Sequence, residues 1–218
     1  MNCSEAFDSL SKTLRELLVD SGAGHDYDHT LRVMKNAEML LEQIHEADGE
    51  VVRFAALLHD CARPEEHLSK GAVCHAKRGA ELALELLKKE KLPSDFCLKV
   101  AEVVRTHRYR DGILPQSPEG KIVFDADKLD SLGAVGLGRA FLFAGACGAR
   151  VHNTAAEALN NDAYGPEDTA YREYLVKLRH LPGAMLTSAG RRLGEERLKF
   201  MEHFFRRLNL EIYGSDDL

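Results

Sequence analysis

The 218-residue chain has no tryptophan, few prolines, and five cysteines that form no C-x-x-C pair. The cysteines are odd in number and widely spaced, so they predict neither a disulfide framework nor a thiolate zinc site. We expect them to be mostly buried thiols in a reducing cytosol. The first residues, 1–5, include no apolar signal-peptide segment, which favours a cytoplasmic protein.

Long apolar runs are also missing. The longest apolar stretch, 132–147, contains Arg139 and several glycines, so we expect no membrane span. No alternating polar and apolar run is long enough for a strand, and no internal repeat is present. The balance of 29 Lys and Arg against 35 Asp and Glu gives a net charge of −6. This acidic balance argues against bulk nucleic-acid binding and still permits a local basic pocket.

Helical periodicity is present along nearly the whole chain. The length suits one domain, and we predict an all-α protein with a single domain over 1–218. Its helical-bundle core spans about 20–146, and a C-terminal helical pair, about 166–213, packs as a cover. The expected helices are 4–18, 26–45, 50–58, 75–89, 92–107, 121–146, 167–180 and 188–211, and the expected loops are 61–73, 110–120 and 147–166.

The apolar segment 54–60 ends in two adjacent polar residues, His59 and Asp60. Burying unpaired polar groups costs a few kcal/mol, and a divalent metal would offset that cost. Taken alone, this pair has a simpler interpretation: a buried histidine whose hydrogen bonds are made within the protein, beside the end of a helix. However, four other possible ligands also lie near ends of expected helices: His29, His75, His107 and Asp127, in the segments 25–29, 74–80, 105–108 and 124–130. A helix bundle can bring such ends together around a metal.

These motifs resemble the HD-domain metal-dependent phosphohydrolase superfamily. The match consists of His29, the pair His59-Asp60, and Asp127 within Ala126-Asp127-Lys128-Leu129. The flanking residues are similar to a small bacterial and archaeal branch of HD phosphohydrolases, some of which are nucleotide pyrophosphohydrolases. The similarity covers about residues 20–213, and it implies an HD-domain-like helical bundle.

The resemblance implies that His29, His59, Asp60 and Asp127 bind a divalent metal. Some branches hold a second metal with two later histidines while the HD aspartate bridges both ions. His75 and His107 are the candidates for that role. Alternatively, His75 is a surface residue at a helix start, and His107 interacts with a helix dipole or contacts the substrate of a one-metal site. Histidines and carboxylates without thiolate suit Mn²⁺, Fe²⁺, Co²⁺, Ni²⁺ or Zn²⁺, as one or two ions.

The expected activity is hydrolysis of a phosphate ester or phosphoanhydride by metal-activated water. A nucleotide is the favoured substrate, in the manner of a dNTP pyrophosphohydrolase or a phosphatase. Asp60 or Asp127 would orient the water, and Glu65, Glu66 or His107 would donate the proton to the leaving group. Basic residues near the ligands are expected to contact the substrate phosphate, although an ordinary solvated surface would also explain them: Arg32, Lys77, Arg78 and Lys128.

Two other functions remain open at this stage. One is a di-iron HD-type oxygenase, which needs both His75 and His107 as ligands. The other is a metal-bearing regulatory protein without turnover, although the intact ligand set argues against it. The expected partner is a small phosphate-containing molecule, without a membrane or bulk nucleic acid, and the oligomeric state is left open.

Overall fold

A computed structural model describes residues 3–20, 26–108 and 113–215 of the chain. Helices and turns make up these residues, which contain no strand, so the all-α prediction is confirmed. The α-helices are α1 (Cys3–Leu17), α2 (Tyr27–Leu41), α3 (Gly49–Leu58), α4 (Arg63–Leu68), α5 (His75–Lys89), α6 (Ser94–Thr106), α7 (Pro118–Leu129), α8 (Gly133–Ala146), α9 (Ala155–Asn160), α10 (Ala170–Val176) and α11 (Ser188–Tyr213). Three short 3₁₀ helices, Leu18–Asp20, Leu178–His180 and Pro182–Ala184, connect them.

Several expected segments differ from the structure for local reasons. The expected loop 147–166 contains the short helix α9, whose N-cap is Thr154, and the helix expected over 26–45 ends at Leu41. The polar segment 61–73 contains the short helix α4, because Pro64 lies in its first turn, where a proline loses no intrahelical hydrogen bond. The single helix expected over 121–146 is two helices, since α7 ends at Leu129 and α8 begins at Gly133. Gly133 has a φ of +71°, a left-handed conformation that interrupts a helix.

The contacts divide the chain into two compact units, Met1–Asp127 and Lys128–Leu218. Each unit has its own buried residues. The single domain over 1–218 and the role of the C-terminal helices as a cover stay predictions.

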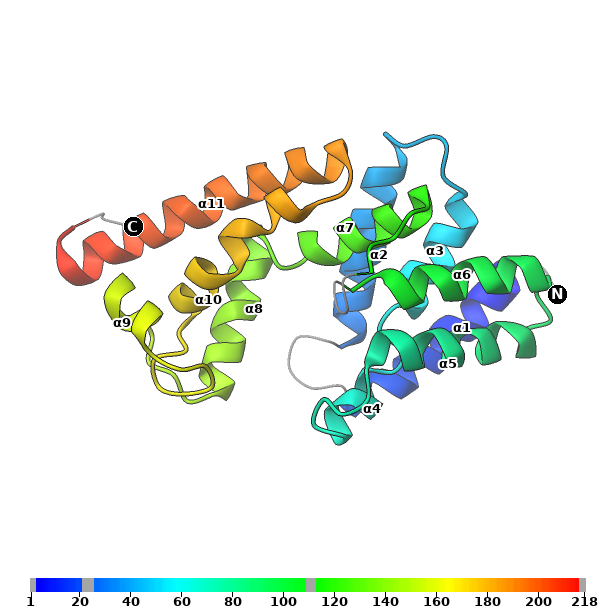
Figure 1. Cartoon of the computed structure of the whole chain (residues 1–218), viewed down its shortest axis with the longest axis horizontal. Helices are drawn as coiled ribbons and strands as arrows, with labels where there is room; N and C mark the ends of the chain where they lie inside the picture. Colours follow the sequence, from blue (N-terminus) through cyan, green and yellow to red (C-terminus); the bar gives the residue numbers. More distant parts are fainter. Residues whose placement is uncertain (1–2, 21–25, 109–112, 216–218) are drawn as a thin grey trace. The chain divides into compact units, whose positions relative to one another are not determined.

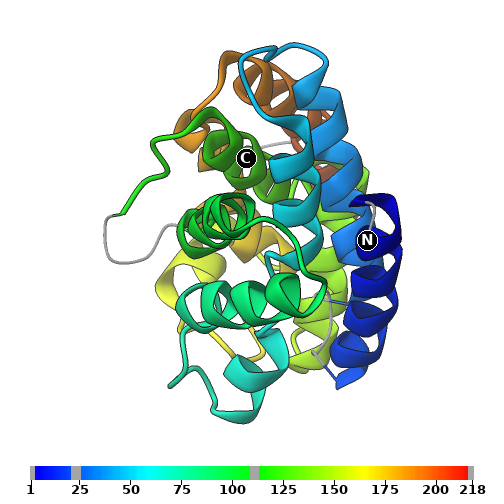
Figure 2. The ribbon, with the colours of Figure 1, turned by 90° about the vertical axis from the view of Figure 1, so that its right-hand side faces the viewer.

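Helix α3 is the central element of the first unit, in contact with α1, α2 and α6. Its residues from Phe54 to Leu58 are fully buried, and burying each large side chain of this kind contributes about 1.5–3 kcal/mol. The Phe54 ring packs edge-on against Phe7 of α1 and Phe96 of α6, with centroids 5.2 and 5.1 Å away. Helices α5 and α6 lie side by side in this unit (Figure 1), and Figure 2 shows α1 at its edge.

The second unit is built on contacts of α8 with α10 and with the long helix α11, and on contacts of α10 and α11 with the 3₁₀ segments between them. Tyr171 and Tyr174 of α10 pack against Phe205 of α11, with ring centroids 5.2 and 4.7 Å away. His152 is buried against Tyr171 and its Nε2–H donates to Asn209 Oδ1 at 2.6 Å. These contacts form the core of the second unit.

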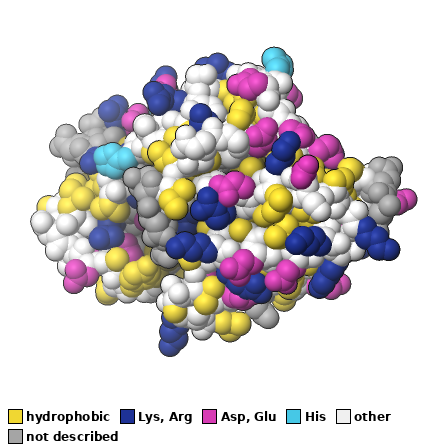
Figure 3. Space-filling model, turned by 45° about the vertical axis from the view of Figure 1, so that its right-hand side comes forward, with side chains coloured by type: hydrophobic (Ala, Val, Ile, Leu, Met, Phe, Trp, Pro, Cys, Tyr) yellow, Lys and Arg dark blue, Asp and Glu magenta, His cyan; other side chains and the backbone are white. Residues whose placement is uncertain are grey.

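No single described helix is long and apolar enough to cross a membrane; only α7 and α8 taken together, as a bent pair, pass that test. Figure 3 shows one face of the molecule, where Lys and Arg side chains alternate with Asp and Glu side chains. The net charge of −6 belongs to the whole chain, and the face in Figure 3 carries side chains of both signs.

Candidate metal centre

Two histidines are fixed by the C-terminal ends of helices. His59 is the C-cap of α3, and its Nδ1–H donates to the carbonyl of Ala56 at 2.8 Å. His107 is the C-cap of α6, and its Nδ1–H donates to the carbonyl of Val104 at 2.6 Å. The last carbonyls of a helix lack intrahelical partners, so each ring supplies a hydrogen-bond donor to a carbonyl at the end of its own helix. Because a carbonyl oxygen only accepts, Nδ1 carries the proton and Nε2 keeps its lone pair.

Two further histidines lie at the N-terminal ends of helices. His29 is in the first turn of α2, where its backbone N–H donates to the N-cap Asp26 at 2.9 Å. His75 is the first residue of α5, and its Nδ1 lies 2.9 Å from Glu66 Oε2. Glu66 is a carboxylate and only accepts, so His75 Nδ1 carries the proton and its Nε2 also keeps a lone pair. Both rings are fully buried.

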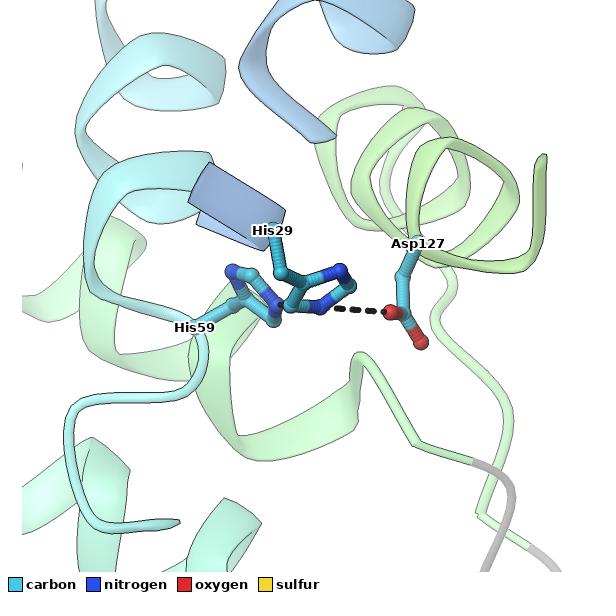
Figure 4. A group of neighbouring side chains, drawn as sticks. All are labelled: His29, His59 and Asp127. Carbon is cyan, nitrogen blue, oxygen red and sulfur yellow. Dashed lines mark hydrogen bonds and ion pairs between the residues drawn. The ribbon is translucent and has the colours of Figure 1, made fainter. Parts of the chain in front are cut away.

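The first group of potential ligands is His29, His59 and Asp127. The Nε2 atoms of His29 and His59 are 3.2 Å apart, and Asp127 Oδ1 lies 3.4 Å from His29 Nε2. Figure 4 shows Asp127 directed from α7 toward His29, with the His29 and His59 rings next to each other. All three side chains belong to the first unit.

The second group is Asp60, His75 and His107. The Nε2 atoms of the two histidines are 3.2 Å apart. Asp60 Oδ1 lies 3.4 Å from His75 Nε2 and 3.7 Å from His107 Nε2. The two adjacent residues after α3 therefore belong to different groups, His59 to the first and Asp60 to the second.

Asp60 also faces the first group with its other oxygen. Its Oδ2 lies 3.6 Å from His29 Nε2 and 3.6 Å from His59 Nε2. The side chain is 1% exposed, and Arg63 Nε donates to Oδ1 at 2.9 Å. One carboxylate thus directs one oxygen to each histidine pair, which is the arrangement of a bridging ligand.

The donor set fits divalent cations on chemical grounds. His75 and His107 both have Nδ1 protonated, so two lone pairs face each other at 3.2 Å beside a carboxylate. That arrangement is repulsive unless a cation accepts the lone pairs. Ligand atoms about 2.1 Å from one ion are separated by roughly 3.0–3.4 Å, which is close to the nitrogen separation in both groups.

Burial also keeps two of these rings neutral. It lowers the pKa of His59 to about 4, although neighbouring Asp60 opposes the shift. Burial likewise lowers the pKa of His75 to about 3, again against the effect of Asp60. Neutral imidazole is the form that binds metal, so the fold prepares both rings as ligands without a preceding proton loss at neutral pH.

We expect metal-free protein to lose stability as the pH falls below about 6.5. The folded pKa of His59 lies below the unfolded value, so its contribution is complete above the unfolded pKa and is lost at lower pH. Between pH 7 and pH 5, this residue should cost about 2 kcal/mol of unfolding free energy. Urea unfolding of chelator-treated protein measures the effect, and His59→Gln should reduce the pH dependence. An unchanged dependence in that variant would show that other groups cause it.

The two glutamates proposed from the sequence as proton donors occupy different positions. Glu65 binds Arg78, whose Nε donates to it at 2.9 Å, and Arg78 also pairs with Glu81. Glu66 is buried and accepts from His75 and two arginines. Burial alone would raise the pKa of Glu66, but the hydrogen bond from His75 and the nearby Arg63 outweigh it and hold the pKa at about 2. Glu66 therefore carries no proton to donate at neutral pH.

The basic residues expected at the substrate phosphate lie on three helices. Arg32 is half-buried on α2, Lys77 is exposed on α5, and Lys128 follows Asp127 near the end of α7. Arg78 of α5 is engaged by the glutamates described above. Contact of these four residues with phosphate stays a prediction.

Residues around the centre that sequence analysis gave no role include Asn36 and Arg63. Asn36 lies on the buried face of α2, and its Nδ2–H donates to the carbonyl of Ala126 at 3.0 Å. This hydrogen bond connects α2 to α7 at Ala126, the residue that precedes Asp127. The only indication in the sequence is a polar residue at the helical spacing of the apolar residues Val33, Ala37 and Leu40.

Replacing Asn36 with leucine should leave the buried carbonyl of Ala126 without this donor. We expect a loss of about 1–3 kcal/mol in unfolding free energy, the cost of an unsatisfied buried polar group. We also expect weaker metal binding, because Asp127 is adjacent to the released carbonyl. Chemical unfolding and metal titration measure the two effects. Lys35→Leu, at an exposed position of the same helix, serves as the control.

Comparison with known proteins agrees with this centre. The family model of the HD domain matches residues 26–132. The protein YpgQ of Bacillus subtilis is 36% identical over 211 residues, which cover 93% of this chain and 92% of YpgQ. The chain belongs to the HD-domain phosphohydrolase superfamily, and the resemblance inferred from the motifs is confirmed.

Solved structures extend the similarity to the whole fold. The crystal structure of YpgQ matches with a TM-score of 0.75 and 30% identity, over 100% of both chains. The structure of YpgQ in complex with ADP matches with a TM-score of 0.72 and 30% identity, also over 100% of both. An HD-superfamily hydrolase of Bacillus thuringiensis matches with a TM-score of 0.73 and 27% identity, over 96% of this chain and 98% of that one. The fold is that of an HD-superfamily hydrolase.

Proposed function

We propose that the protein is a metal-dependent phosphohydrolase that cleaves a phosphate ester or phosphoanhydride of a nucleotide. The observation that carries the proposal is Asp60, which directs one carboxylate oxygen to each of two histidine pairs. His29, His59 and Asp127 would hold one divalent ion, His75 and His107 a second, and Asp60 would bridge them. When bound, such ions supply Lewis-acid activation of water and of a phosphoryl oxygen.

The protein residues prepare this chemistry in three ways. The helix ends fix the histidine rings with their lone pairs directed inward, so little reorganisation is needed to bind an ion. Asp60 and Asp127 accept hydrogen bonds only, which suits them to orient a water molecule toward phosphorus. Since Glu66 is held as a carboxylate, we assign it to the orientation of His75 and leave proton donation to other groups.

The nucleotide is proposed from two observations. The homologous YpgQ has been solved in complex with ADP. In this chain, Arg63 pairs with the proposed ligand Asp60 and Arg108 lies beside the proposed ligand His75, which supplies the positive charge that phosphoryl chemistry requires. Mixed charges on the face in Figure 3 accord with a small substrate rather than a long nucleic acid.

An oxygenase is the second candidate, because one observation favours it as well. Two ligand groups joined by a carboxylate also suit a pair of iron ions, which need His75 and His107 as ligands. The two functions differ in their requirement for oxygen. Protein that contains two irons, consumes oxygen and releases no phosphate would support the oxygenase.

The test combines elemental analysis of the purified protein with a screen for released phosphate and pyrophosphate. Nucleotides with one, two and three phosphates are incubated with Mn²⁺. We expect metal-dependent hydrolysis that is lost in His59→Ala, whereas His45→Ala, at an exposed position of the same unit, keeps it. Folded protein that binds no divalent metal would refute the proposal.

A further inference from the structure

Two arginines share one buried carboxylate beside the second ligand group. Arg63 Nη1 donates to Glu66 Oε2 at 2.7 Å, and Arg108 Nη1 donates to Glu66 Oε1 at 2.8 Å. Arg63 comes from the start of α4, whereas Arg108 directly follows the C-cap of α6. Glu66 thus joins two segments that are 42 residues apart in the sequence.

This cluster lies in direct contact with the proposed ligands. Arg63 Nε donates to Asp60 Oδ1 at 2.9 Å, and Arg108 Nη1 lies 3.0 Å from His75 Nδ1. His75 Nδ1 donates to Glu66, so the arginine nitrogen is a neighbour of that atom and Glu66 is its acceptor. Any group bound beside Asp60 and His75 is therefore within reach of two guanidiniums.

Each guanidinium keeps donors for a further acceptor. Arg63 uses Nε and Nη1, and Arg108 uses Nη1, so Nη2 of both and Nε of Arg108 have no acceptor among the described residues. The side chains are 18% and 28% exposed, so a ligand can reach them. Glu66 and Asp60 offset the charges of the two guanidiniums, so the cluster is formally neutral while its remaining N–H donors stay available to a ligand.

We propose that Arg63 and Arg108, held in place by Glu66, bind the diphosphate portion of the substrate next to the metal centre. A guanidinium presents paired N–H donors that match phosphate oxygens, and two such groups suit two adjacent phosphoryl groups better than one. The inference rests on the proposed function, because it assigns the substrate class of the same site. It also distinguishes these arginines from Arg78, whose ion-pair partners are Glu65, Glu81 and Glu85 and include none of the proposed ligands.

The test measures binding rather than turnover. AMP, ADP and inorganic pyrophosphate are titrated by calorimetry into the wild-type protein as purified, Arg108→Gln and Arg108→Lys. We expect Arg108→Gln to weaken ADP and pyrophosphate binding by about tenfold or more, the usual effect of losing charge-assisted hydrogen bonds. AMP binding should change little. Arg108→Lys should recover part of the loss, because lysine keeps the positive charge but lacks the paired N–H donors of a guanidinium.

Arg105→Gln is the matched control. It is the same substitution on α6, and Arg105 pairs with Glu102 at the exposed surface. Equal metal content in all variants separates phosphate binding from damage to the ligands. If the protein hydrolyses no nucleotide yet Arg108→Gln loses diphosphate binding, the proposed function fails and the binding site stands. Wild-type protein that binds neither ADP nor pyrophosphate, or Arg108→Gln with unchanged affinities, would overturn the inference.

Discussion

Replacing Asp60 with asparagine should lower kcat of the proposed hydrolysis by about a thousandfold. Asparagine keeps the shape of the side chain but removes the negative charge and one of the two oxygens that face the histidine pairs. Lewis-acid stabilisation contributes several kcal/mol, and each 1.36 kcal/mol changes a rate tenfold. The metal content should fall in both groups together, since this one residue contributes to both.

Elemental analysis and steady-state kinetics measure these effects. Asp48→Asn is the matched control, because Asp48 is the N-cap of α3 and asparagine caps a helix equally well. His75→Ala should remove one ion and leave the group with His29 and His59 occupied. An Asp60→Asn protein with normal metal content and turnover would show that Asp60 serves only as the partner of Arg63.

Replacing Gly136 with alanine should destabilise the second unit by about 3 kcal/mol. A methyl group at this position would overlap the backbone carbonyl of Ser131, in the turn just before α8. Backbone atoms cannot move aside as a flexible side chain can, so α8 or the turn must shift. Chemical unfolding of the two proteins measures the difference.

Gly138 supplies the control on the same helix. A methyl group there meets open space, so Gly138→Ala should stabilise the protein by about 0.5–1 kcal/mol through the smaller entropy of the unfolded chain. Equal effects of the two substitutions would contradict the proposed steric cause. In the structure, Gly133 adjoins Arg197 of α11, whereas Gly136 adjoins the backbone of its own turn.

The helical class and most helix positions were predictable from the sequence. Periodic apolar residues placed α5 at its observed bounds, 75–89. These features depend on residues within a few positions of one another, so the local sequence contains the information. The short helix α4 was missed because its composition is polar and its burial depends on contacts outside the segment.

The candidate ligands were also named from the sequence, through the spacing of His29, His59-Asp60 and Asp127 and their resemblance to a known family. The sequence could not decide how His59 and Asp60, about 100° apart on an ideal helix, would serve one centre. In the structure α3 ends before both residues, and His59 faces the first ligand group while Asp60 directs one oxygen to each group.

The sequence by itself determined an all-helical chain of the HD superfamily and the residue types available for metal binding, because periodicity and motif spacing are local properties. The tertiary structure decided which atoms face one another. Hydrogen bonds to Ala56, Val104 and Glu66 set the proton on His59, His107 and His75, and the approach of α4 to the end of α6 gave Glu66 its second arginine, Arg108. These contacts join residues that are distant along the chain or depend on how a helix ends, so they arise only when the chain folds.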